Sequence, residues 1–245
     1  MTVAHSPSDA AVWHDLECGS YRQDLPLWRS LAARQGGPVL EIGAGTGRVA
    51  LDLAAAGHAL TALEREPSLL TELARRAAEL PVTCVEADAR RFRIDERFTL
   101  CIVAMQTIQV LGGDDGRQAC LECARRHLRP GGIIAVAIVE TVELFHATAG
   151  GPDLPAEACE RNGVLYSSRP TAILSDAAGY VLERRREIVA TSGERTARYD
   201  SVHIDQLTGT ELEAEATAVG LQPAGRASVP PTPTHSGSTV VIFRA

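Results

Sequence analysis

The chain has 245 residues, 45% of them hydrophobic, which is enough for one α/β domain with an insertion and an ample core. The formal net charge is −7, and no lysine is present. The arginines are dispersed along the chain and partly countered by acids, as in residues 183–187 (ERRRE), so the sequence predicts no basic face for the phosphates of a nucleic acid. We therefore expect a small-molecule substrate and no nucleic-acid partner.

Membrane, metal and redox roles are also disfavoured. No stretch approaches the ~20 apolar residues of a membrane span, and the first nine residues lack an apolar signal core. We expect no membrane partner and a cytoplasmic location, where the six cysteines would be reduced. Cys120 and Cys123 have C-x-x-C spacing, but no second pair or His tandem follows, so no metal site is expected.

The first predicted element is a helical segment over residues 10–36. Apolar residues recur there at helical spacing, including Trp13, Leu16, Trp28 and Leu31, and the pattern stops at a Gly-Gly-Pro sequence. Because this segment precedes the first predicted strand, we expect it to fold over a bound ligand as an N-terminal cover.

A glycine-rich turn follows the first predicted strand. The apolar run that begins at Val39 passes through Glu41 into glycines at positions 43, 45 and 47, and a helical pattern starts at once. Glycine lacks a Cβ atom, so the backbone can turn tightly and touch a ligand. The first N–H groups of the helix point into that turn. This pattern predicts the first strand–turn–helix of a nucleotide-binding α/β domain.

The spacing of the turn separates the candidate nucleotides. A dinucleotide fingerprint is G-x-G-x-x-G, whereas this chain has G-x-G-x-G with Glu41 two residues before Gly43. A carboxylate at that position would repel a pyrophosphate, but it suits a ligand with a cationic amino group. S-adenosylmethionine (SAM) is such a ligand.

Four further motifs follow in chain order. A short strand at 59–64 ends in Glu64, and another at 82–90 ends near Asp88. A buried strand at 98–106 comes next, and a Leu-Arg-Pro-Gly-Gly turn then precedes a strand at 133–139.

In this order the five motifs resemble the class I SAM-dependent methyltransferases of the small-molecule type, over residues 39–139. The resemblance implies a Rossmann-like sheet of seven mostly parallel strands with an antiparallel last strand, binding SAM and releasing S-adenosylhomocysteine. The predicted cofactor-binding residues are Glu41, Gly43, Ala44, Gly45, Gly47, Glu64, Arg65, Asp88, Ala89 and Gln106.

The resemblance also assigns roles to several of these residues. Glu64 would accept hydrogen bonds from the ribose hydroxyls. Asp88 would accept from the adenine amine, while the N–H of Ala89 would meet a ring nitrogen. Gln106 and Gln109 follow the fourth strand, where they either contact ligands or satisfy their own backbone.

The rest of the chain predicts an insertion and a return to the core. Strand-like runs at 164–174, 180–191 and 195–204, separated by turn residues, predict an antiparallel meander over the active site. A helix over 207–220, a sixth strand near 222–229 and a last strand at 238–243 follow. We expect one domain, 1–245, with the cover at 1–36, the SAM-binding core at 37–140 and 208–245, and the insertion at 141–207.

The predicted reaction is methyl transfer to an N or O atom of a small molecule, mainly by alignment and desolvation. The sequence after the fourth strand lacks the (D/N/S)-P-P-(Y/F) motif of enzymes that methylate nucleic-acid amines. Candidate catalytic residues are Tyr21, His146 and His203, with His14, Glu140, Tyr166 and His235 as further candidate bases.

Two other interpretations stay open at this stage. In the first, the chain is a methyltransferase that acts on protein or RNA. In the second, it is a non-catalytic protein that binds SAM or another nucleotide, or an NAD enzyme. The protein is expected to be a monomer or a homodimer.

Overall fold

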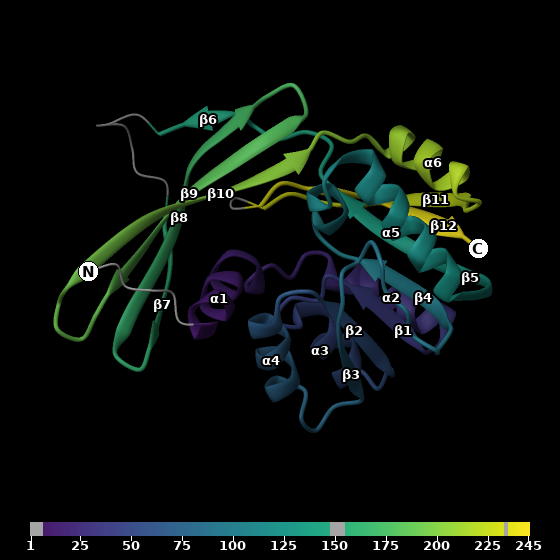
Figure 1. Ribbon diagram of the computed structural model, residues 1–245, viewed down its shortest axis with the longest axis horizontal. Coiled ribbons are helices and arrows are strands. Elements are labelled where there is room, and N and C mark those ends of the chain that lie inside the picture. Colours follow the sequence, from purple (N-terminus) through teal and green to yellow (C-terminus); the bar gives the residue numbers. More distant parts are fainter. Residues whose placement is uncertain (1–6, 148–154, 233–234) are drawn as a thin grey trace. The chain divides into compact units, whose positions relative to one another are not determined.

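The computed structural model describes residues 7–147, 155–232 and 235–245. The chain divides into two compact units (Figure 1). The insertion unit combines residues 1–20 with 141–206, and the core unit combines residues 21–140 with 207–245. No helix in the described part of the chain is long and apolar enough to cross a membrane.

Seven strands form the sheet of the core unit, in the order β11-β12-β5-β4-β1-β2-β3. Neighbours from β5 to β3 are parallel, and β12 runs antiparallel to both β5 and β11. The strands are β1 Val39–Ile42, β2 Leu60–Glu64, β3 Val82–Glu86, β4 Phe98–Val103, β5 Leu128–Ile138, β11 Gln222–Val229 and β12 Ser238–Arg244. The predicted sheet of seven mostly parallel strands with an antiparallel last strand is confirmed. That last strand, β12, lies between β5 and β11.

Helices cover both faces of this sheet because its strands are apolar on both sides. In β4, Cys101 and Val103 pack in one cluster with α5 and α6, while Leu100 and Ile102 pack in a second cluster with α2 and α3. A smaller cluster adds α4 to the side of α3. The helices are α2 Leu25–Gln35, α3 Arg48–Ala55, α4 Pro67–Arg76, α5 Gly113–His127 and α6 Gly209–Ala218.

One local expectation in the core is corrected. The Leu-Arg-Pro-Gly-Gly segment was expected to be a turn before the fifth strand, but β5 already begins at Leu128. The register between β4 and β5 shifts between Phe98 and Leu100, and Gly131 has a φ of 77°. The segment is therefore an irregular start of the strand, in which Gly131 takes the left-handed conformation.

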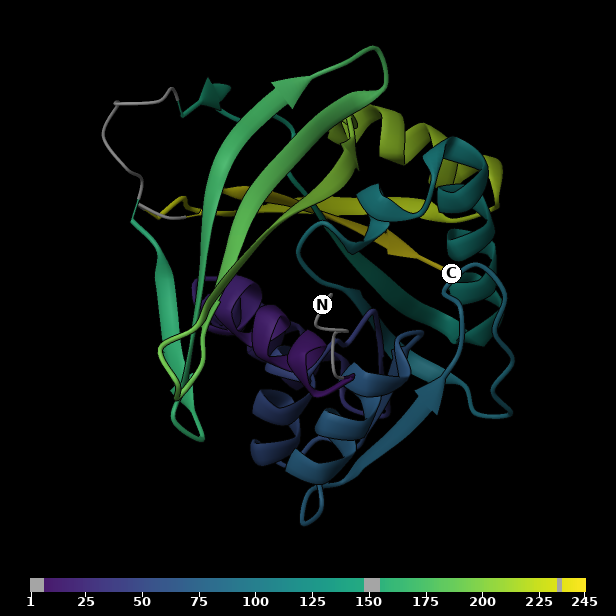
Figure 2. The same cartoon turned by 60° about the vertical axis from the view of Figure 1, so that its left-hand side comes forward.

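The insertion unit contains an antiparallel sheet in the order β10-β9-β8-β6, with β7 also paired to β8. Its strands are β6 Phe145–His146, β7 Glu157–Arg161, β8 Val164–Ser175, β9 Gly179–Val189 and β10 Arg195–Asp205. Figure 2 shows β8, β9 and β10 as three long, curved neighbours. These three are the predicted meander, whereas β6 and β7 were not predicted.

The N-terminal helical segment is divided between the two units. Helix α1 (Pro7–His14) and a π-helical turn (Asp15–Gly19) belong to the insertion unit, and α2 belongs to the core unit. The π-helical turn is bound to the insertion sheet through Glu17, which accepts from Ser168 at 2.7 Å and from two nitrogens of Arg186 at 2.7 Å each. The helical periodicity at 10–36 therefore does not indicate that its first part packs in the insertion unit and its second part in the core unit.

The loops after β4 and β5 are joined by one buried side chain. Gln109 lies in the 3-10 turn Thr107–Val110 and is fully buried. Its Nε2 donates to the Val139 carbonyl at 2.9 Å, and its Oε1 accepts from the Val139 N–H at 2.8 Å. Both backbone groups lie just beyond the end of β5, so the amide satisfies them where the ladder stops. The side chain of Gln109 thus satisfies the backbone hydrogen-bonding groups of Val139 in the neighbouring loop.

We expect Gln109→Leu to lower the free energy of unfolding by roughly 2–4 kcal/mol, because it leaves both backbone groups of Val139 unpaired in a buried place. Urea denaturation measures the change. Gln118→Leu, at a half-exposed position on α5, is the matched control and should stay within about 0.5 kcal/mol of the parent. Equal stability of the two variants would contradict the structural role of Gln109.

Candidate functional site

The glycine turn between β1 and α3 has the geometry of a ligand-binding backbone. Gly43, Gly45 and Gly47 have φ values of 73°, 56° and 96°. A Cβ on Gly43 would lie 2.4 Å from Cγ2 of Thr107, and one on Gly47 would lie 2.2 Å from Cδ1 of Leu73. At these two positions both the conformation and the available space therefore exclude other residues.

Glu41 is a buried carboxyl next to this turn. It is 2% exposed, and its Oε2 atom has no hydrogen-bond partner among the described residues. Burial raises the pKa of Glu41 to about 8, against the opposing effects of Arg48 and of the Ala50 backbone. A buried oxygen without a partner is unusual in a folded protein. A cationic amino group would satisfy it, which is the fit expected for the ammonium of SAM.

Glu64 connects two turns of the core unit. Its Oε2 accepts from the Gly45 N–H at 2.9 Å, and its Oε1 accepts from the N–H groups of Arg65 and Glu66, each at 2.9 Å. A carboxylate has about four acceptor positions, so these three bonds leave room for about one more donor. Glu64 therefore holds the glycine turn against the end of β2, with limited capacity for the predicted ribose contacts. Arg65 is exposed beside it.

Asp88 is engaged by a neighbour in its own loop. Arg90 donates to its two carboxylate oxygens at 2.9 and 2.6 Å, and the Arg90 N–H donates at 2.9 Å. Hydrogen bonds from this side chain hold the pKa of Asp88 well below its usual range. Ala89 is 8% exposed and packs in the core cluster. The predicted adenine amine would have to share this carboxylate with Arg90.

The loop after β4 contains a non-glycine residue in the left-handed region. Met105 has a φ of 53°. Such a conformation costs energy and tends to occur where a loop is held in place for binding. Gln106 follows it at the start of the 3-10 turn, and Thr107 packs against Gly43. The loop that contains Gln106 therefore lies beside the glycine turn.

Tyr21 belongs to the core unit and lies in a buried polar cluster. It is 5% exposed, and its ring is stacked on His235 with centroids 4.9 Å apart. The guanidinium carbon of Arg48 is 5.3 Å from the ring centre. The Tyr21 hydroxyl makes no hydrogen bond of ordinary geometry to the described residues. Burial first, and then the charge of Asp24, raise the pKa of Tyr21 above its ordinary value, against Arg48 and a nearby Ser238 hydroxyl.

Arg48 and Asp24 form the ion pair beneath this ring. The two side chains are 6% and 4% exposed, and their paired N–O distances are 2.5 and 2.7 Å. Arg48 also donates to the Tyr21 carbonyl at 3.0 Å, and Asp24 accepts from Trp28 Nε1 at 2.8 Å. Sequence reasoning missed this pair, since its members are 24 residues apart and neither stands in a recognisable motif.

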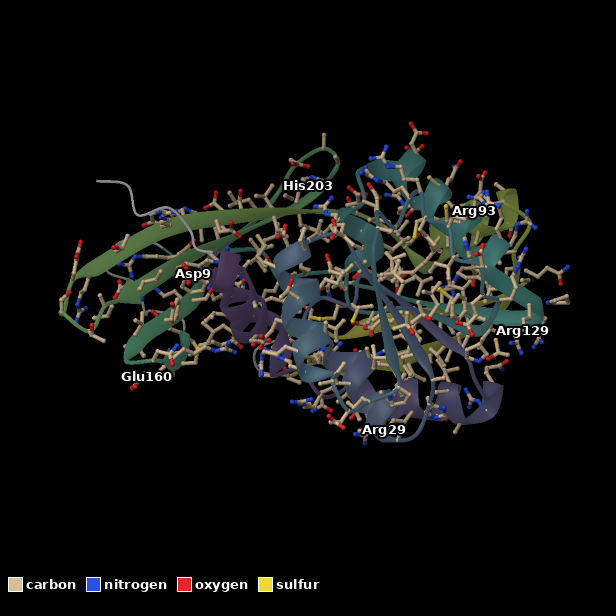
Figure 3. The ribbon with its side chains drawn as sticks, turned by 60° about the horizontal axis from the view of Figure 1, so that its bottom comes forward. Asp9, Arg29, Arg93, Arg129, Glu160 and His203 are labelled. Carbon is tan, nitrogen blue, oxygen red and sulfur yellow. The ribbon has the colours of Figure 1, made fainter. Side chains whose placement is uncertain are left out.

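His146 and His203 lie in the insertion unit and not with Tyr21. His203 is beside the turn after β8, with Asp176 at 3.3 Å from its Nε2 and Asp205 at 3.5 Å from its Nδ1 (Figure 3). His146 is exposed on β6. The strands β6 and β10 are the two ends of the sheet order, so about 14 Å of strand spacing separates these histidines. They cannot act together on one atom.

Two other candidate bases have structural partners. Glu140 accepts from the Gly209 N–H at 2.7 Å and from the Thr239 hydroxyl at 2.6 Å, so it fixes the start of α6 to β12. The hydroxyl of Tyr166 donates to Asp9 at 3.1 Å. Among the described residues no group of His, Cys, Asp or Glu could hold a metal ion.

The site can now be compared with known proteins. Residues 39–132 match the family described as methyltransferase domain. A curated relative, the cypemycin N-terminal methyltransferase of a Streptomyces species, is 29% identical over 112 residues, 46% of this chain and 46% of that protein. The match thus spans about half the length of that relative.

Solved structures share the fold over almost the whole chain. The CcbJ methyltransferase from Streptomyces caelestis has a TM-score of 0.70 at 22% identity, with 93% of this chain and 91% of that one covered. SAM-bound CalS10, an amino pentose methyltransferase from Micromonospora echinaspora, has a TM-score of 0.69 at 18% identity, with coverages of 100% and 99%.

Glu41→Gln tests the buried carboxyl through the pH dependence of stability. Because burial raises the pKa of Glu41 from 4.5 to about 8, its contribution is full below pH 4.5 and is lost as the pH rises toward 8. The variant lacks this loss, so its stability relative to the parent should increase by roughly 3–5 kcal/mol between pH 4.5 and 8.5. Urea unfolding at both pH values measures the difference. A constant difference would show that Glu41 is not a buried, protonated acid.

Glu64→Ala should reduce the affinity for SAM by tenfold or more, since it removes both the anchor of Gly45 and the acceptor for the ribose. Calorimetry with SAM, S-adenosylhomocysteine and NAD measures the loss, and NAD should give no signal with the parent. Asp88→Asn should weaken binding less, because its amide oxygen still accepts. Parental affinity in Glu64→Ala would mean that the ribose site is elsewhere.

Proposed function

We propose that the chain is a class I SAM-dependent methyltransferase that transfers the methyl group to the nitrogen of a small-molecule amine. The buried, unpartnered carboxyl of Glu41 beside the three left-handed glycines supports the cofactor side of this proposal. The proposed acceptor rests on two similar proteins, whose names specify the N-terminus of cypemycin and an amino pentose.

The chain's own residues bind and orient the two reactants. When bound, SAM would supply a methyl group on a sulfonium: the acceptor's lone pair would bond to the methyl carbon in line as the carbon–sulfur bond breaks and neutral S-adenosylhomocysteine leaves. Glu41, in its ionised form, would pair with the ammonium group, and the glycine turn would let the ligand approach the backbone. Glu64 keeps that turn in place through the Gly45 N–H. The main contribution of the protein is alignment in a site from which water is excluded.

Tyr21 fits an orienting role better than that of a base. Its raised pKa keeps the hydroxyl protonated at neutral pH, so it can donate or accept a hydrogen bond but does not readily take a proton. An ammonium acceptor must lose a proton before it attacks. His146 and His203 stay candidates for that step, on the proposal that the insertion covers the site.

The substrate and setting follow from the same features. A net charge of −7 supports a small molecule over a nucleic acid. The six cysteines are free, which fits a cytoplasmic protein. We expect a monomer or a homodimer, which light scattering can decide.

The acceptor class is tested with methyl-labelled SAM and a panel of amines. The panel contains amino sugars and short peptides with free amino groups, each paired with its N-acetylated form. We expect label on free amines alone. Label on hydroxyl groups, or equal labelling of the acetylated forms, would refute N-methylation, and NAD binding in place of SAM would refute the cofactor.

Tyr21→Phe should lower turnover by tenfold or more while SAM affinity stays within a few-fold, because the hydroxyl is lost but the ring and its packing remain. Steady-state rates and calorimetry separate the two quantities. His146→Ala and His203→Ala are measured in parallel, and a loss confined to one of them would assign the base. Unchanged turnover in Tyr21→Phe would remove this residue from the mechanism.

A further inference from the structure

An arginine groove lies in the core unit, away from the glycine turn. Its lining residues are Arg97, Arg125, Arg126, Leu128, Arg129, Pro130 and Ala245. Its volume is about 700 Å³. Arg97 directly precedes β4, and Arg129, labelled in Figure 3, is the second residue of β5. The groove therefore lies where the parallel strands begin, whereas the glycine turn follows the end of β1.

The four guanidinium groups of this groove have few counter-ions. The side chains of Arg97 and Arg125 make no hydrogen bond or ion pair with any described residue. Arg126 has a carboxylate at 3.6 Å, that of Glu122, but both side chains are 54% exposed. Arg129 donates to the backbone carbonyl of Arg97 at 3.0 Å and forms no ion pair with a described residue. Like charges gathered in one groove repel each other, so a multivalent anion would be favoured there.

We propose that the arginine groove binds a small molecule that carries a di- or triphosphate group. Guanidinium groups match pairs of phosphate oxygens with two parallel hydrogen bonds. Leu128 and Pro130 in the lining provide apolar contact for the rest of the ligand. A nucleic acid fits less well, because the groove holds four arginines in a chain with a net charge of −7, whereas a nucleic-acid site needs an extended basic surface.

Calorimetry with sodium pyrophosphate at fixed ionic strength tests this proposal on the full chain. We expect saturable binding with a Kd below about 1 mM, and at least tenfold weaker binding of orthophosphate, because fewer arginines can be engaged. The double variant Arg97→Gln, Arg125→Gln should weaken pyrophosphate binding by tenfold or more. The matched control is Arg22→Gln, Arg34→Gln, which removes the same charge from exposed positions outside the groove and should stay within twofold.

Three results would overturn the proposal. One is a heat signal no larger than that of dilution. Another is an equal loss in both double variants, which would reflect net charge and not the groove. The third is loss of pyrophosphate binding when S-adenosylhomocysteine is present, which would place pyrophosphate at the glycine turn. The arginines substituted in both double variants are exposed, so these variants should have the same melting temperature as the parent. If the double variant in the groove does not fold, Arg125→Gln alone replaces it.

Discussion

The turn from Gly43 to Gly47 is the constraint on which the site depends. Its three left-handed glycines bring the backbone against Thr107 on one side and Leu73 on the other, at distances that leave no space for a Cβ. The loop after β4 and helix α4 are thereby packed against the turn. The Gly45 N–H donates to Glu64, which also holds the turn against the end of β2.

The three acidic residues of the site differ in whether their carboxylate oxygens already have hydrogen-bond donors. Glu64 and Asp88 already have donors around their carboxylates, from three backbone N–H groups and from Arg90. Glu41 has a buried oxygen without one. The physical cost of an unpaired buried oxygen makes Glu41 the position where a bound cation would contribute most. The motif position alone did not distinguish these three acids.

A buried ion pair decides where the N-terminal segment goes. Arg48, the first residue of α3, pairs with Asp24 and contacts both the ring and the carbonyl of Tyr21. Removing one partner of such a pair leaves a buried charge uncompensated, which costs more than the pair contributes. The pair and the buried side chains of Leu25, Trp28 and Leu31 together hold residues 21–35 in the core unit, while α1 packs on the insertion sheet.

The amino-acid sequence by itself determined the succession of the core strands along the chain, the glycine turn and the approximate strand limits of the meander. These features depend on local rules: period-2 or continuous apolar runs, turn residues, and glycine where φ is positive. Only the tertiary structure decided which side chains meet. The pairing of Arg48 with Asp24, the stacking of Tyr21 on His235, and the use of Gln109 to bind Val139 join residues far apart in the chain, and their partners are chosen by packing that no local pattern encodes. Residues 10–36 show the same limit, since helical periodicity reports an apolar face but not the surface that the face will cover.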